Sequence, residues 1–288
     1  MNVKIVVASG KGGTGKTTVA TSLALAIRRK VENLQFLDCD VEEPNAGLLL
    51  KPELDGDVPV TLSMPVIDRV RCTGCGKCSE ICRYNAMAVV NQQALVFQNL
   101  CHACGGCGLI CPEEAISEED RVIGRLETGK RDNITFLRGV LNVGEPMATP
   151  VVKALKARAR DDMLTILDAP PGTACPVIAT VKDCDYCVLV TEPTPFGLYD
   201  LDLMSKVVRT MNIPACIVIN KDDGSSQDIE AYARENDIRI LMRIPLSRDI
   251  AVNYAKGFPL NQTDRYWDTE FCRLYEKLEN EICRSPLK

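Results

Sequence analysis

Two groups of residues in the 288-residue chain have types and spacing suited to chemistry: a glycine-rich loop near residue 10 and eight regularly spaced cysteines. The loop, residues 10–17, reads G-K-G-G-T-G-K-T and fits the pattern G-x4-G-K-[ST] between a strand-like run and a helix-like run. Glycines let backbone N–H groups point at phosphate oxygens, Lys16 reaches the β- and γ-phosphates, and the Thr17 hydroxyl coordinates Mg²⁺. The loop therefore predicts a site for ATP and Mg²⁺. The residues expected to bind there are Gly12, Gly13, Thr14, Gly15, Lys16, Thr17 and Thr18.

The eight cysteines form two copies of the spacing C-x2-C-x2-C-x3-C. In bacterial ferredoxins such runs hold [4Fe–4S] clusters, and the fourth cysteine of each run ligates the other cluster. Glycines between the cysteines let the loops curl so that backbone N–H groups face the sulfurs. These glycines are Gly74, Gly76, Gly105 and Gly106. We expect one cluster on Cys72, Cys75, Cys78 and Cys111, and a second on Cys101, Cys104, Cys107 and Cys82.

The main alternative for these cysteines is a pair of zinc sites, each held by four thiolates. Zinc sites usually pair two separated C-x2-C knuckles, which the two continuous runs do not resemble. Arg83 follows Cys82 where the ferredoxin pattern has proline, a departure that removes no ligand. His102, between two ligands, is expected to be a loop residue that hydrogen-bonds outward. The cysteines expected to be buried thiols are Cys39, Cys184, Cys187, Cys216, Cys272 and Cys283.

Composition limits the classes of function. The net charge of −5 gives no general attraction to nucleic acid or anionic lipid. No apolar stretch approaches the roughly 20 residues that a membrane span needs. The strand-like run Lys4–Ala8 leads directly into the glycine loop, so we expect no export signal. These features predict a cytoplasmic protein with neither a nucleic-acid nor a membrane partner.

The rest of the chain alternates between strand-like and helix-like segments, which predicts an α/β protein with a parallel sheet. The strands are expected at Val3–Ala8, Leu34–Leu37, Met163–Leu167, Tyr186–Val190, Cys216–Ile219 and Ile238–Leu241. The helices are expected near 17–29, 146–160, 197–211, 226–236, 247–256 and 267–282. The last helix has one apolar face and a mixed-charge polar face, so we expect it to pack on the sheet. The cysteine-rich segment, residues 61–118, is expected to be an insert between two parts of the α/β domain, residues 1–60 and 119–288.

Three further positions complete a resemblance. Lys11 is a second lysine in the glycine loop, Asp40 follows the strand at Leu34–Leu37, and Asp168 opens the sequence D-A-P-P-G. Together with the loop, these residues resemble the deviant Walker A family of P-loop ATPases, which includes MinD, ParA, the Mrp proteins and the nitrogenase iron protein. The whole chain resembles the MinD-superfamily ATPases that contain an inserted ferredoxin domain. The expected fold is therefore a SIMIBI-type, MinD-like parallel-sheet P-loop NTPase with a small bacterial-ferredoxin-like α+β insert.

The resemblance implies roles for individual residues. It implies a nucleotide-sandwich dimer, with itself or with a related chain, in which Lys11 reaches the partner's ATP. It also implies that Asp40 activates water, Asp168 holds the Mg²⁺ shell and Gly172 belongs to a switch that senses the γ-phosphate. Asn220 resembles the family's adenine-contacting asparagine, and Pro245 lies in the loop that closes the base pocket. Cys175 is expected to be a structural cysteine, although the iron protein binds a bridging cluster near the equivalent place.

Three classes of function fit these features. In the first, ATP binding and hydrolysis gate electron transfer from the clusters to a redox or metal-cofactor protein. In the second, the protein assembles or loads an iron–sulfur or other metal cofactor. In the third, it is a positioning ATPase of the MinD and ParA type with structural clusters. The closed set of eight ligands favours the first class, and the acidic balance disfavours the third.

Overall fold

The computed structural model describes residues 3–284, and the chain divides into two compact units. The first unit comprises the residues up to Asp57, Leu126–Val140, and those from Val152 onward. The second comprises Val58–Arg125 and Leu141–Val151. The second unit thus extends beyond the cysteine-rich segment on both sides and includes a short stretch, Leu141–Val151, that the sequence does not suggest.

The first unit is built on a parallel sheet with the strand order β11-β10-β9-β1-β8-β2-β7, which β6 and β3 extend. Every pairing from β11 through β7 is parallel. The expectation of a parallel-sheet P-loop fold is therefore confirmed. The strands are β1 (Lys4–Ala8), β2 (Leu34–Asp38), β3 (Glu53–Ile67), β6 (Ile116–Arg131), β7 (Ile134–Leu141), β8 (Leu164–Asp168), β9 (Tyr186–Thr191), β10 (Ala215–Asp222) and β11 (Arg239–Pro245).

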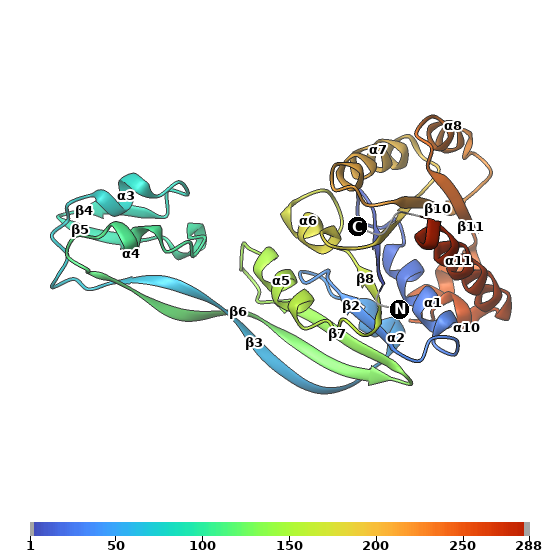
Figure 1. The fold of residues 1–288 in the computed structure, drawn as a ribbon, viewed down its shortest axis with the longest axis horizontal. Helices are drawn as coiled ribbons and strands as arrows, with labels where there is room; N and C mark the ends of the chain where they lie inside the picture. Colours follow the sequence, from blue (N-terminus) through green and yellow to red (C-terminus); the bar gives the residue numbers. More distant parts are fainter. Residues whose placement is uncertain (1–2, 285–288) are drawn as a thin grey trace. The chain divides into compact units, whose positions relative to one another are not determined.

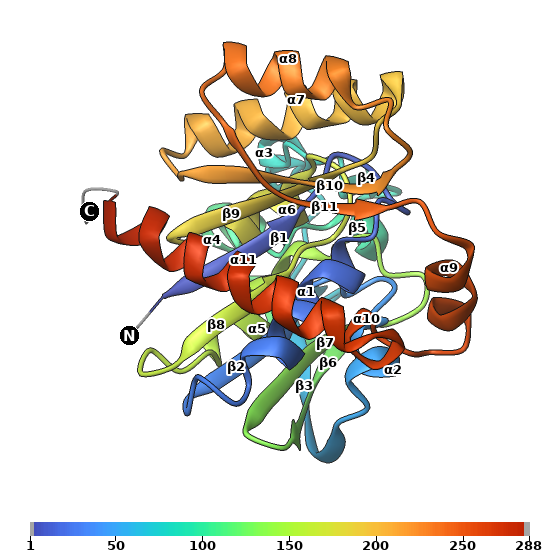
Figure 2. The ribbon, with the colours of Figure 1, turned by 90° about the vertical axis from the view of Figure 1, so that its right-hand side faces the viewer.

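Helices cover both faces of this sheet (Figures 1 and 2). The helices α1, α10 and α11 lie on one face, in the foreground of Figure 2, and α5, α6 and α7 lie on the other. The central strands β1, β2, β8 and β9 are almost completely buried, which explains their continuous apolar sequences. The helices are α1 (Lys16–Ile27), α2 (Ala46–Leu50), α5 (Thr149–Ala157), α6 (Cys175–Val181), α7 (Pro195–Thr210), α8 (Gln227–Glu235), α9 (Arg248–Ala255), α10 (Leu260–Thr263) and α11 (Arg265–Arg284).

The second unit contains short elements between the ends of two long strands. Both β3 and β6 begin in one unit and end in the other, so the chain crosses the boundary within them. The hairpin of β4 (Met87–Val90) and β5 (Gln93–Val96) is antiparallel. Its helices are α3 (Lys77–Ile81), α4 (Gly106–Ile110) and the 3₁₀ turn η1 (Gln98–Leu100). Two small apolar clusters that include cysteines form its core.

The last helix, α11, was expected to pack on the sheet; its apolar face is buried as predicted, but it packs mainly against α1 and also contacts β11. Phe271, Leu274 and Leu278 are buried there, and Ile282 packs against the same core. Within the described part of the chain, no helix has the length and apolar character to cross a lipid bilayer.

The packing of α11 can be tested with Phe271→Ala. Phe271 is fully buried, so removing its ring should lower the free energy of unfolding by about 3–5 kcal/mol. Tyr266→Ala, on an exposed side chain of the same helix, should change it by less than about 1 kcal/mol. Urea unfolding of both variants measures the difference. Equal effects would contradict the packed position of α11.

Candidate functional site

The glycine loop connects β1 to α1 and borders a cavity of about 420 Å³. Gly15, directly before α1, has φ +91°, and a Cβ added there would lie 2.1 Å from the Asn220 side chain. Only glycine fits this position, for both reasons. No side chain caps the first turn of α1, so its N–H groups remain available to an anion.

The structure brings most of the predicted nucleotide residues to this one cavity. Loop residues, Asp40 and the two predicted base-pocket residues all line it. Those that line it are Gly12, Gly13, Gly15, Lys16, Thr17, Thr18, Asp40, Asn220 and Pro245. Thr14, Asp168 and Gly172 are not among the lining residues, and Pro171 contributes in place of Gly172. Further lining residues that the sequence did not suggest include Glu43, Asn45, Lys221 and Tyr254.

Two carboxylates, Asp40 and Asp168, act on the charge of the loop lysine, and a third, Asp38, lies beside Asp168. The parallel register places Asp38 at the end of β2 beside Asp168 at the end of β8, and both are fully buried. Burial lowers the pKa of Lys16, while Asp168 and Asp40 oppose that shift. Burial raises the pKa of Asp40 to about 6, with Lys16 acting in the opposite direction. Buried carboxylates crowded in this way favour protonation unless a cation joins them.

Asp168 has the most unusual environment of the three. Burial raises its pKa to about 7, although the nearby Thr17 hydroxyl and Lys16 lower it. Neither of its carboxylate oxygens has a hydrogen-bond partner of normal geometry among the described residues. Burial, and then the charge of Asp168, raise the pKa of Asp38 well above its usual range. A hydrated Mg²⁺ held by Thr17 fits this arrangement, because its water ligands would supply the donors that Asp168 lacks.

Lys11 points to a residue of its own chain. Its ammonium forms an ion pair with Glu192, which follows β9. Lys221 Nζ also binds Glu192, at 3.2 Å, and donates to the Gly13 carbonyl at 2.8 Å. Burial alone would raise the pKa of Glu192, but the two lysines hold it below its usual range. The sequence places Glu192 directly after a strand, and this position is the only sequence feature that could have identified it as a site residue.

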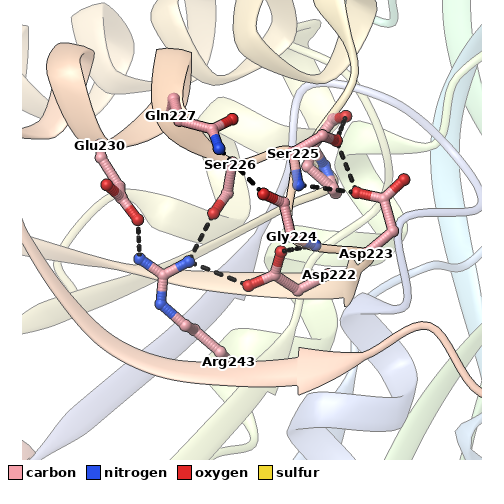
Figure 3. A network of polar contacts seen from close by, with 9 residues as sticks. Asp222, Asp223, Gly224, Ser225, Ser226, Gln227, Glu230 and Arg243 are labelled. Carbon is pink, nitrogen blue, oxygen red and sulfur yellow. Dashed lines mark hydrogen bonds and ion pairs between the residues drawn. The ribbon is translucent and has the colours of Figure 1, made fainter.

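The end of the cavity predicted to hold the base is fixed by hydrogen bonds. Asn220 is buried and donates from Nδ2 to the Thr14 carbonyl at 2.7 Å. Beyond it, Arg243 of β11 bonds the Asp222 carboxylate at 2.9 Å and the Ser226 hydroxyl at 2.6 Å, as Figure 3 shows. Arg243 also pairs with Glu230 of α8 at 2.6 Å. This network ties the segment after Asn220 to α8 and β11.

The eight regularly spaced cysteines line two cavities within the second unit. Cys72, Cys75, Cys78 and Cys111 line one of them. Cys82, Cys101, Cys104 and Cys107 line the other. In each cavity, the fourth cysteine of one run therefore lies with the first three of the other run.

The local backbone suits cysteine sulfurs that carry charge. Backbone N–H groups donate to Cys82 and Cys111 at 3.3 Å and to Cys101 at 3.4 Å. Gly74 has φ +69°, and a Cβ there would lie 2.4 Å from the Gln92 carbonyl oxygen. Gly76 and Gly105 also have positive φ, whereas Gly106 does not and instead opens α4. Among residues 3–284, no three His, Cys, Asp or Glu side chains are grouped to hold a single metal ion.

The other cysteines only partly follow expectation. Cys39, Cys184, Cys187 and Cys216 are buried, as predicted. Cys272 is only half-buried and Cys283 is exposed, so their assignment as buried thiols is wrong. Both lie on α11, where Cys272 borders the apolar face and donates to the Ala26 carbonyl at 3.5 Å, while Cys283 is turned toward solvent. Cys175 is exposed at the start of α6, and His102 stacks on Tyr84 with ring centroids 3.7 Å apart.

Comparison with known proteins gives the family. The model of the CobQ/CobB/MinD/ParA nucleotide-binding domain matches residues 5–260. The chain belongs to the CobQ/CobB/MinD/ParA family. An uncharacterized protein of Methanocaldococcus jannaschii is 31% identical over 88% of this chain and 89% of its own length.

More distant members of the family are named. The iron–sulfur cluster carrier protein of Pyrococcus horikoshii is 23% identical, covering 97% of this chain and 86% of that protein. The septum site-determining protein MinD of Pyrococcus horikoshii, in complex with Mg-ADP, has a TM-score of 0.61 at 18% identity and full coverage of both chains. The MinD-type fold is thus established for this chain, and residues 5–260 match a nucleotide-binding domain.

The buried carboxylates of this family member predict how its stability depends on pH. Asp168 has a higher pKa folded than unfolded, so the folded state binds more protons between about pH 4 and 7. In the absence of nucleotide, Asp168 therefore lowers stability as pH rises through that window. Asp168→Asn should reduce this slope, to which the raised pKa values of Asp38 and Asp40 also contribute, and raise the free energy of unfolding at pH 7 by about 1–3 kcal/mol. It should also reduce the stabilisation that ATP and Mg²⁺ give.

Thermal unfolding from pH 4 to 8, with and without ATP and Mg²⁺, measures both effects. The matched control is Asp57→Asn, which changes an exposed aspartate of the same unit. An Asp168→Asn protein that is less stable than the parent at pH 7 without nucleotide would contradict the buried, unpaired carboxylate.

Proposed function

We propose that this protein binds and hydrolyses ATP and couples nucleotide-driven dimerisation to electron transfer from two [4Fe–4S] clusters to a partner protein. The observation that carries the proposal is the pairing of cysteines across the two cavities. Two runs that exchange their fourth cysteine are what a two-cluster ferredoxin arrangement requires. The same chain contains the nucleotide cavity of a P-loop ATPase.

The cysteine cavities fit cubane clusters in two respects. Each offers four thiols, the number of protein ligands that a [4Fe–4S] cluster takes. The N–H groups directed at sulfur stabilise thiolates and tune a cluster's potential. When bound, the clusters would supply one-electron chemistry, while the chain's own part is to hold them and shape their surroundings.

In the nucleotide cavity each residue has a separate role in ATP hydrolysis. Lys16 and the N–H groups at the start of α1 bind the phosphates, and Thr17 with Asp168 holds Mg²⁺ and its water. Asp40 orients the attacking water, and its raised pKa lets it accept a proton near neutral pH. Lys11 leaves Glu192 to reach the ATP of the second subunit, which is either a second copy or a related chain. The compartment expected for such a protein is the cytoplasm.

A second candidate function is assembly or loading of an iron–sulfur or other metal cofactor. It is favoured by relatives named iron–sulfur cluster carrier protein in Pyrococcus horikoshii and Methanocaldococcus jannaschii. In this function the cysteine cavities would pass a cluster on, whereas in electron transfer they keep it. Retention of the clusters on incubation with an apo-acceptor protein distinguishes the two.

Anaerobically purified protein should contain about eight iron and eight acid-labile sulfide per chain, as two four-iron clusters require. Cys111→Ser should remove a ligand from one cavity and lower the iron content by up to about half. Cys283→Ser, which changes an exposed cysteine of α11, should leave the iron content unchanged. Iron and sulfide assays with EPR of the reduced protein make the measurement. Two zinc ions per chain without sulfide would refute the cluster proposal.

Dimerisation should depend on ATP and on Lys11. In Asp40→Ala, which should bind ATP without hydrolysing it, ATP and Mg²⁺ should double the mass seen by light scattering. Adding Lys11→Ala should abolish this change, because no other lysine then reaches across to the partner's phosphates. Lys30→Ala, an exposed lysine on the far side of α1 from the loop, is the control. If the natural partner is a related chain, Asp40→Ala alone should stay monomeric with ATP, and mixing it with that chain should produce the ATP-dependent increase in mass.

Nucleotide state and cluster potential should be coupled. The strand β3 follows directly on α2, so the segment containing Asp40 is tied by the chain to the cysteine unit. ATP binding to Asp40→Ala should shift a cluster potential by about 40 mV for each kcal/mol of coupling, with a matching change of about fivefold in ATP affinity on reduction. Potentiometric EPR titration with and without ATP and Mg²⁺ is the test. Equal potentials and equal affinities would leave the clusters structural and favour the positioning class.

A further inference from the structure

Helix α5 belongs to both units of the chain. Its first residues, up to Val151, belong to the second unit, and the residues from Val152 onward belong to the first. Val151, Val152 and Leu155 are completely buried, so packing holds both parts of the helix. A helix is a stiff element because each turn is hydrogen-bonded to the next, so a displacement of one end moves the other. The chain therefore offers α5 as a rigid connection between the two units.

The end of α5 in the first unit is fastened to α6 by one side chain. Lys156 Nζ donates to the Ala179 carbonyl at 2.9 Å and to the Thr180 carbonyl at 2.8 Å. It also donates to the Lys182 carbonyl. The last carbonyls of a helix have no partner within the helix and favour a positive charge. Lys156 thus uses all three ammonium donors to close the C-terminal end of α6.

The other end of α6 follows a segment that borders the nucleotide cavity. Pro171 lines that cavity, and the Gly172 N–H donates at 3.2 Å to the carbonyl of Ser9, just before the glycine loop. Helix α6 begins soon after, at Cys175, and no side chain among the described residues caps its first turn. A shift of the segment beside the nucleotide is therefore passed into α6 and reaches its C-terminal end.

The segment that precedes α5 is fastened to β6 in the second unit. Arg121 of β6 and Glu145 form a bidentate ion pair with N–O distances of 2.6 and 2.8 Å. From the same segment, the Asn142 N–H donates to the Ile123 carbonyl at 2.9 Å, and its Nδ2 donates to the Val122 carbonyl at 3.1 Å. The strand β6 begins shortly after the second cysteine run ends. A displacement of α5 thus reaches β6 and the backbone beside the cysteines.

We propose that α5 transmits the nucleotide state to the second unit, with Lys156 and the Arg121–Glu145 pair as its two attachments. This transmission rests on the proposed function, in which ATP binding alters the surroundings of the clusters, and α5 is a route separate from β3. Closure of the nucleotide site moves the segment after β8, α6 moves with it, Lys156 shifts α5, and Glu145 shifts β6. These three side chains are not among those that line the nucleotide cavity or the cysteine cavities, so they are positioning residues.

The test uses the full, cluster-containing chain with Asp40→Ala, which should hold ATP without hydrolysing it. Hydrogen–deuterium exchange and the cluster potentials by EPR titration are measured with and without ATP and Mg²⁺. In Asp40→Ala alone, ATP should change the potentials and the exchange of residues 141–151 and 175–182. Adding Lys156→Met, which removes the donors at similar length, should abolish the change in the potentials and at 141–151 but keep that at 175–182. Its Kd for ATP and its nucleotide-free potentials should equal those of Asp40→Ala.

Two further variants place the second attachment and the charge. Glu145→Leu should keep the ATP-dependent change at residues 175–182 and lose the shift in potential, because the break then lies beyond α5. Lys156→Arg, which still donates to carbonyls, should keep the shift. Lys153→Met, at an exposed lysine of the same helix, is the control and should match Asp40→Ala in every measurement.

A full ATP-dependent shift in Lys156→Met or in Glu145→Leu would overturn the inference, even if the variant unfolds at a lower temperature, since that result would make the contact structural only. An equal loss in Lys153→Met would also overturn it. If Lys156→Met fails to fold, Glu145→Leu decides alone. If ATP changes nothing in Asp40→Ala itself, the coupling in the proposed function fails. If ATP acts there and Lys156→Met behaves identically, only the role of α5 fails.

Discussion

Burial of Asp38 and Asp168 beside Lys16 is the constraint around which the nucleotide site is arranged. Parallel pairing of β2 with β8 brings the two carboxylates side by side where both strands end. The loop after β1 then places a single buried ammonium among them. Burial outweighs the charge of one lysine, so the pKa of Asp168 rises, and neither Asp168 oxygen has a hydrogen-bond partner of normal geometry among the described residues. A bound nucleotide with its cation would supply the compensating charge and the hydrogen-bond donors for these carboxylates.

The excess of buried carboxylates over buried cations connects the stability of the fold with the binding of a ligand. Buried charge without a partner lowers the stability of the nucleotide-free fold, and binding relieves that strain. The same carboxylates organise their neighbours, since Asp38 holds the backbone at Asp40 and Ala46. Elsewhere in the cavity, polar groups are satisfied within the protein, as with Asn220 on the Thr14 carbonyl and Lys221 on the Gly13 carbonyl.

The second unit, which contains the eight regularly spaced cysteines, has only a small apolar core. Its two clusters of buried residues are small, and cysteines form part of each. Asn85 and Glu114 have left-handed backbones, and the N–H groups that follow them donate to the sulfurs of Cys82 and Cys111, which stabilises negative charge there. Under the proposed function, bound clusters would supply much of the stability that this small apolar core does not.

The sequence by itself determined the parallel α/β fold, the P-loop and the division of eight cysteines into two sets, because each depends on local spacing. Glycines before Lys16 and the repeat C-x2-C-x2-C-x3-C constrain the backbone within a few residues. The apolar stripe of α11 likewise fixed which face is buried, although it did not exclude exposure of Cys283. Only the tertiary structure could decide that Lys11 pairs with Glu192, that Arg243 fixes the segment after Asn220, and that Asn45 Oδ1 lacks a partner. These contacts join strands and loops far apart in the chain, and their geometry depends on sheet order and register, which no local pattern encodes.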